Sequence, residues 1–130
     1  MNVPSFTRCF LALALTRGSL KFAGFRRTTR WARRLARRPG ATEADRDAAE
    51  RAARRVAVAA AFFPGRAICL EQSIALYVLL RRRAVPAVLQ LGVQPYPFKA
   101  HAWVEVDGQP IYENADDLIK FVPFPSEAAA

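Results

Sequence analysis

The pattern of hydrophobic and polar positions predicts a helical first half. Over residues 6–38 apolar side chains recur at helical spacing, with Arg on the remaining face, which predicts two short helices divided near residues 18–24. The run Arg-Arg-Pro-Gly at 37–40 ends the second helix, and Thr42 is placed to cap a third that continues to about Phe62. The apolar positions of the first two helices are Phe6, Phe10, Leu13, Ala14, Phe22, Phe25, Trp31 and Leu35.

A fourth helix is predicted to begin at Cys69. The Pro64-Gly65 pair separates it from the third helix, and residues 69–83 contain no Gly or Pro and are apolar on most sides. This composition is typical of a buried central helix. Pro86 marks its end.

The pattern then changes from the period of a helix to that of a strand. Residues 88–93 and 100–106 alternate, and in the second run His101, Trp103 and Glu105 share one face. Asp107-Gly108 is a hairpin signal, and the chain is expected to return through Ile111 and Tyr112. We therefore predict an α+β fold, in which N-terminal helices and a central Cys-bearing helix pack on a small antiparallel sheet.

Length and composition favour one folded domain over residues 1–130. We expect a helical, Arg-rich, partner-facing half at 1–66, and a core at 67–125 that carries the candidate catalytic residues considered below. The chain's hydrophobic content of 52% excludes a largely disordered chain. The net charge is +9, yet residues 1–66 hold 15 basic and four acidic side chains, whereas residues 67–130 hold five and seven. Such a basic surface suits nucleic acid, anionic lipid or an acidic peptide, so charge does not identify the partner.

The cysteines indicate a reducing compartment. The chain has two, Cys9 and Cys69, which make no disulfide framework, and no secretory signal is visible. No apolar run reaches the roughly 18 to 20 residues that span a bilayer. We expect a cytoplasmic protein without a membrane span.

Cys69 and His101 are the candidate catalytic residues. A helix N-terminus stabilises an anion and lowers the pKa of a thiol, although most cysteines simply pack in a core. His101 is the only histidine, and a Cys with a His is the minimum for thiol catalysis. Glu113, on the returning strand, could orient the imidazole; Asp107, Asn114 and Asp116 are rivals for that role.

The runs Cys69-Leu70-Glu71-Gln72-Ser73-Ile74-Ala75-Leu76 and Ala100-His101-Ala102-Trp103-Val104-Glu105-Val106-Asp107-Gly108 resemble the leader peptidase of lasso-peptide biosynthesis, a branch of the transglutaminase-like, papain-type superfamily. The likeness covers residues 69–114 of the chain. It implies that Cys69 is the nucleophile and His101 the base. The family's third residue is usually an Asp, and its place falls on Glu113, which departs from the pattern.

The resemblance implies a cysteine protease that removes the leader from a ribosomally made precursor, so that a separate ATP-dependent cyclase can close the ring. The helical, Arg-rich first half of the chain also resembles the shorter members of the family, in which a separate small protein recognises the leader. The implied partners are the precursor, that protein and the cyclase, with no cofactor, metal or nucleic acid.

Three alternatives remain open. A zinc site on Cys69 and His101 is conceivable, but the chain lacks CxxC or HxxxH spacing. Arg pairs along the first half suggest a nucleic-acid-binding or adaptor protein, although no nucleic-acid fold motif is present. An acyltransferase of the transglutaminase type would use the same thiol, because both reactions pass through a thioester.

Overall fold

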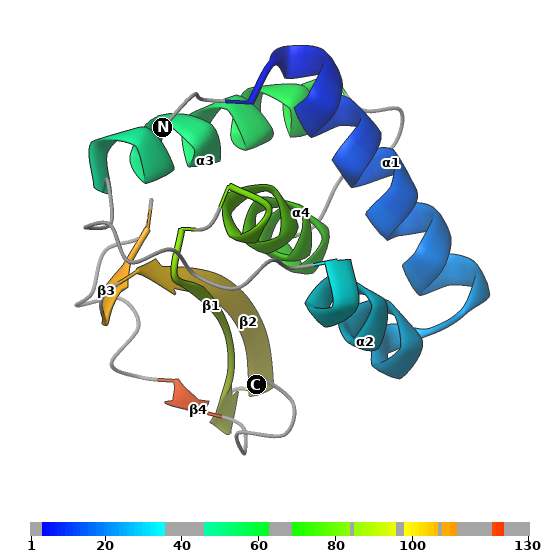
Figure 1. The fold of residues 1–130 in the computed structure, drawn as a ribbon. Coiled ribbons are helices and arrows are strands. Elements are labelled where there is room, and N and C mark those ends of the chain that lie inside the picture. The colour runs from blue at the N-terminus through cyan, green and yellow to red at the C-terminus, as the bar shows by residue number, and fades with distance from the viewer. Residues whose placement is uncertain are drawn as a thin grey trace.

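Helices precede a four-stranded antiparallel sheet in the computed structural model of the chain (Figure 1). The structure describes residues 4–35, 46–62, 69–83, 85–95, 98–106, 108–111 and 121–123. Within them lie helices α1 (Phe6–Phe22), α2 (Phe25–Leu35), α3 (Arg46–Ala61) and α4 (Cys69–Arg81). The strands are β1 (Ala87–Pro95), β2 (Phe98–Val106), β3 (Gln109–Pro110) and β4 (Val122–Pro123). This arrangement confirms the predicted α+β class.

The first two helices form an α-hairpin with a sharp break. The Ser5 side chain caps α1 by accepting the Arg8 N–H at 3.3 Å. The predicted division is confirmed within a narrower span: α1 continues through Gly18, and the chain turns at Gly24, whose φ of +89° favours glycine.

The apolar stripe predicted along these two helices is only partly buried. Leu13 lies in the core, whereas Phe22, Trp31 and Leu35 are largely exposed. The buried face of α2 consists of Thr28, Thr29 and Ala32. The two Thr hydroxyls donate to carbonyls one turn earlier, so they need no polar partner from the core.

Helices α3 and α4 form the centre of the molecule. The inward face of α3 is mostly Ala, and these small side chains let the neighbouring helices approach closely. The end of α3 at Ala61 agrees with the prediction, while its predicted cap, Thr42, lies outside the described residues. Helix α4 begins at Cys69 as predicted and ends at Arg81, followed by a turn in which Arg83 N–H donates to the Leu80 carbonyl.

The sheet has the order β3-β2-β1-β4. Strands β1 and β2 pair along their whole length, with Leu89 opposite Val104 and Gly92 opposite His101. The predicted turn is present at Gly108, whose φ is +74°. The returning strand β3 is Gln109–Pro110, and the Ile111 N–H still donates to the Val104 carbonyl of β2, as the predicted return through Ile111 requires. Tyr112 lies outside the described residues.

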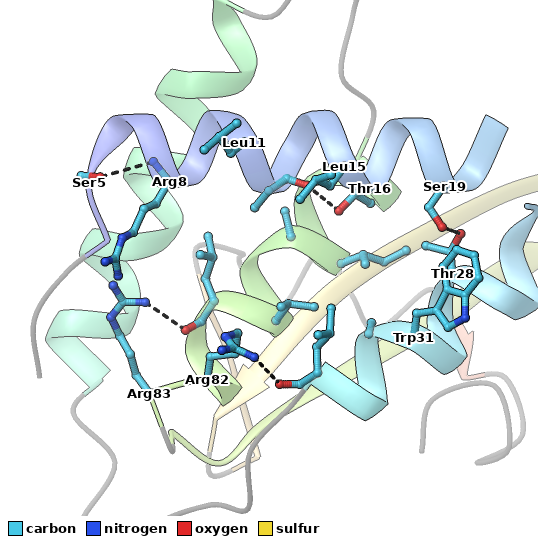
Figure 2. Close-up of a pocket in the computed structure, with 17 residues that line it drawn as sticks. Ser5, Arg8, Leu11, Leu15, Thr16, Ser19, Thr28, Trp31, Arg82 and Arg83 are labelled. Carbon is cyan, nitrogen blue, oxygen red and sulfur yellow. Dashed lines mark hydrogen bonds between the residues drawn. The ribbon is translucent and has the colours of Figure 1, made fainter. Parts of the chain in front are cut away.

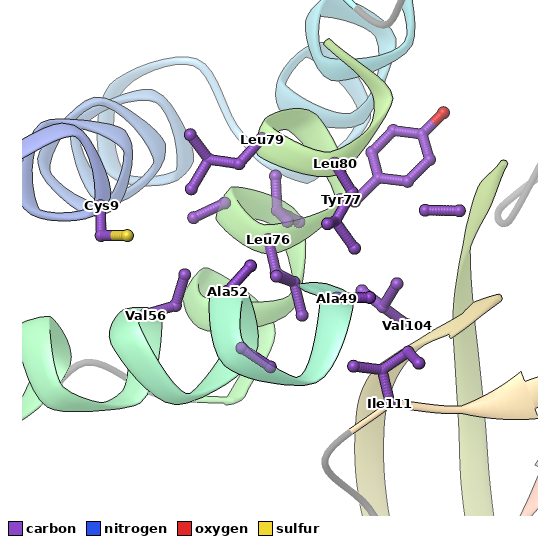
Figure 3. Close-up of a cluster of buried hydrophobic side chains, with 14 of the residues drawn as sticks. Cys9, Ala49, Ala52, Val56, Leu76, Tyr77, Leu79, Leu80, Val104 and Ile111 are labelled. Carbon is purple, nitrogen blue, oxygen red and sulfur yellow. The ribbon is translucent and has the colours of Figure 1, made fainter. Parts of the chain in front are cut away.

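Helix α4 lies between the other helices and the sheet, as Figure 1 shows. Leu76 and Leu80 of α4 pack with α1, α3 and the sheet in one hydrophobic cluster (Figure 3). From the sheet, Ala87, Leu89, Val104 and Val106 join this cluster. No helix in the described part of the chain is long and apolar enough to cross a membrane.

Candidate active site

The start of α4 is held against strand β2 by a buried hydrogen bond. Ser73, one turn after Cys69, donates from its hydroxyl to the Ala102 carbonyl at 2.9 Å. Ser73 is in the second turn of α4, the helix that begins at Cys69, so the first turns of this helix meet β2. The structure thus brings together the two elements that carry Cys69 and His101.

The contact is made at one particular edge of β2. The Val104 carbonyl accepts the Ile111 N–H at 2.8 Å, on the side of β3. Carbonyls two residues apart in a strand point to the same side, so the Ala102 carbonyl also points toward that edge, beyond the pairs that join β2 to β3. The first turns of α4 therefore meet the outer edge of β2 beside His101.

His101 lies in an aromatic cluster on the face of the sheet opposite the helical core. Its ring stacks on Trp103, with centroids 5.7 Å apart, and lies 5.4 Å from the Phe121 ring. The Trp103 indole donates to Glu105 Oε2 at 2.8 Å. The predicted row of His101, Trp103 and Glu105 along one face is confirmed, because Val104 faces the helices.

Gly92 makes room for this cluster. It pairs with His101 across the sheet, and a Cβ atom at Gly92 would lie 2.9 Å from Phe121 Cβ and 3.0 Å from Trp103 Cη2. The first distance is shorter than Cβ atoms tolerate, and the second is tighter than most Cβ contacts, so a neighbouring atom would have to move. The absence of a side chain at Gly92 is therefore needed for the aromatic rings to approach the strand.

The candidates for the third catalytic residue are not placed by the structure. Glu113, Asp107, Asn114 and Asp116 all lie outside the described residues. The role of Glu113 remains a prediction. The roles of Cys69 and His101 also remain predictions, which the placement of their elements supports.

A buried carboxylate in the first turn of α4 was not singled out from the sequence. Glu71 is buried, with Oε1 4.0 Å from Arg17 Nε, and its Oε2 has no hydrogen-bond partner. The positive end of the helix dipole favours a negative charge at this position. Acidic residues near helix starts are too common in sequences for Glu71 to have been identified by its position. Its contact with Arg17 of α1 is visible only in the fold.

Cys9 is a core residue rather than a second catalytic thiol. Its side chain is fully buried among α1, α3 and α4 (Figure 3). Burial raises the pKa of the Cys9 thiol, and the charges of Arg55 and Arg83 oppose this only in part. A protonated, enclosed thiol is a poor nucleophile.

Comparison with known proteins agrees with this architecture. The family profile Transglut_core3, described as the transglutaminase-like superfamily, matches residues 12–126, which is most of the chain. The chain belongs to the transglutaminase-like superfamily. The fold class inferred from the resemblance is that of this superfamily.

The chain is also similar to the Microcin J25-processing protein McjB of Escherichia coli, with 49% identity over 43 residues. This segment is 33% of the present chain and 21% of McjB, so the chain spans a minor part of its relative. No solved structure matches. The resemblance to the peptide-processing branch of the superfamily is confirmed by these findings.

Proposed function

We propose that this transglutaminase-like protein is a cysteine peptidase that removes the leader from a lasso-peptide precursor before macrolactam cyclisation. The observation that carries the proposal is the Ser73–Ala102 hydrogen bond, which holds a helix beginning at Cys69 against the strand of the only histidine. Similarity to a microcin-processing protein supports a peptide substrate.

The proposed reaction has two steps. The imidazole of His101 takes the proton of the Cys69 thiol, and the thiolate, favoured by the N-terminus of α4, attacks the carbonyl carbon of the scissile bond. The C–N bond breaks, the amino group of the core peptide leaves with the proton from the imidazolium, and the leader remains as a thioester. Water, deprotonated by His101, then releases the leader as a carboxylic acid.

Each group has a separate task in this scheme. Glu113 would orient the imidazole and stabilise the imidazolium, as an Asp does elsewhere. Cleavage frees the α-amino group that an ATP-dependent cyclase would join to a side-chain carboxyl. We propose the precursor, a separate leader-recognition protein and the cyclase as the partners of this cytoplasmic step.

Mass spectrometry of the precursor, mixed with this protein and the recognition protein, tests the proposal. Cys69→Ala and His101→Ala should each reduce leader removal by at least about a thousandfold, and Glu113→Gln by about tenfold or more. Cys9→Ala is the matched control and should retain activity, because Cys9 lies in the core. Full activity of Cys69→Ala would overturn the proposal.

The same masses separate hydrolysis from acyl transfer. Hydrolysis gives a leader ending in a free carboxyl group, whereas a transglutaminase-type reaction gives a leader joined to an amine. If Glu113→Gln is silent and Asp107→Asn or Asp116→Asn is damaging, the third residue has been assigned wrongly.

A further inference from the structure

An open groove of about 1480 Å³ runs between α1, α2 and α4 (Figure 2). Within the part of the chain that the structure describes, the residues that line it belong to these helices or to positions next to them, and none belongs to the sheet. Arg82 and Arg83, directly after α4, line the groove, and on α4 itself the lining residues are Ile74, Ala75, Val78 and Leu79. Their spacing places them on a stripe of α4 turned away from the Ser73 face.

The walls of the groove are apolar and uncovered. Leu11 and Leu15 on α1 are 55% and 73% exposed, and Trp31 and Leu35 on α2 are 45% and 52% exposed. In each pair the residues are four apart, so both helices present a continuous apolar edge to the groove. Trp31 and Leu35 belong to the apolar stripe that the sequence pattern predicts, whereas Leu11 and Leu15 lie outside it. Exposed apolar side chains gathered along a groove mark binding sites.

One end of the groove is strongly basic. Arg8, Arg82 and Arg83 line it, and none of the described residues that line the groove is acidic. Arg82 and Arg83 donate to the Leu35 and Leu79 carbonyls. Burial lowers the pKa of Arg83, and the charge of Arg8 lowers it further. A carboxylate brought by an occupant would offset the repulsion between Arg8 and Arg83 and could pair with the guanidinium groups.

We propose that the groove docks the leader segment of the peptide substrate, with apolar side chains along α1 and α2 and a carboxylate among Arg8, Arg82 and Arg83. This inference rests on the proposed function, because the leader is the part of the substrate that it names. A second copy of this chain is a poor occupant, since its net charge of +9 would be brought to an already basic groove.

The place of the groove on α4 favours the substrate as the occupant. Ile74, which lines the groove, is five positions from Cys69, or about 7.5 Å along the helix axis. A segment bound there reaches the start of α4 through about four to six extended residues, counting the path around the helix. The groove-binding segment should therefore lie that far before the scissile bond.

The experiment measures binding of a fluorescently labelled leader peptide to the Cys69→Ala protein, in which cleavage is blocked. Leu15→Glu should weaken binding at least tenfold, because it places a carboxylate on the apolar wall. Phe22→Glu is its control on the same helix, 86% exposed and outside the groove, and should change affinity less than twofold. Arg82→Glu should likewise weaken binding tenfold, and the exposed Arg54→Glu on α3 is its control.

The outcomes are distinguishable from one another. Unchanged leader affinity in folded Leu15→Glu and Arg82→Glu variants would overturn the proposal. So would groove variants that lose binding of the recognition protein, or of a duplex DNA probe, and still bind the leader normally. Leader bound in the groove with no cleavage by the unmodified protein would support the docking site and reject the peptidase function.

Discussion

At the scale of single residues, the fold places one of the two cysteines, Cys9, in the hydrophobic core. Cys69 begins a helix, while Cys9 is enclosed by three helices and has no exposed surface. Counting the cysteines in the sequence does not show that Cys9 is buried, because burial depends on contacts between residues that are distant in the chain. The burial of Cys9 leads to a prediction about how stability depends on pH.

The pKa of Cys9 is raised above its ordinary value of 9.0 on folding, so the native state holds this proton more tightly than the unfolded chain does. The resulting stability is complete below that value and is lost as the pH rises through it and toward the higher folded-state pKa. Between about pH 8 and about pH 10, the free energy of unfolding should fall more steeply in the unmodified protein than in Cys9→Ala. Urea unfolding at both pH values measures this, and parallel losses would contradict it.

Ser73 is expected to act as a positioning residue. Ser73→Ala removes the hydrogen bond to Ala102 and should lower the free energy of unfolding by about 1 kcal/mol. It should also reduce kcat with little change in KM and alter the rate at which iodoacetamide alkylates Cys69.

Ser19→Ala is the control for this prediction. It removes a hydrogen bond of 2.6 Å between α1 and α2 and should cost a similar amount of stability. Its effect on alkylation of Cys69 should be absent. Equal effects of the two variants on the alkylation of Cys69 would mean that Ser73 has only a structural role.

At the scale of elements, the sheet depends on close contact between β1 and the aromatic cluster around His101. Gly92→Ala should destabilise the fold by about 1–3 kcal/mol, because the added methyl group meets Phe121 and Trp103. Thermal unfolding followed by circular dichroism measures the loss. Leader removal should also fall, since both rings contact His101.

Gly18→Ala provides the opposite case. Gly18 lies within α1, and a Cβ atom there would meet nothing within 4 Å. The substitution should raise stability by about 0.5–1 kcal/mol through helix propensity alone. A destabilised Gly18→Ala variant, or a Gly92→Ala variant as stable as the unmodified protein, would contradict the packing described around these two glycines.

Sequence periodicity predicted the elements whose signals are local. The start of α4 follows the Pro64-Gly65 break, and the β1–β2 pair follows from alternation and the Gly108 turn. Strand β4 is too short to have a pattern, and its pairing with Gly92 and Val93 is visible only in the fold. The same holds for the approach of Arg17 to Glu71.

At the scale of the whole molecule, the hydrophobic pattern alone could not tell core from binding surface. Leu13 and Leu15 belong to the same apolar helix, yet the first is buried and the second faces the groove. The distinction depends on where α2 and α4 lie, which no local pattern encodes. The sequence predicts Cys69 and His101 as the candidate site, and their roles stay a prediction. The hydrogen bond by which Ser73 holds α4 against β2 is visible only in the fold.

The central position of α4 has a consequence for how this protein can evolve. Nearly every side chain of α4 between Ser73 and Leu80 is at least partly enclosed, so a substitution there alters packing on several sides at once. Changes of substrate preference are tolerated more easily on α1 and α2, where Leu15 and Trp31 are exposed and few contacts are lost. Homologues that process different peptides should therefore diverge along the groove walls while the helix that begins at Cys69 stays nearly constant.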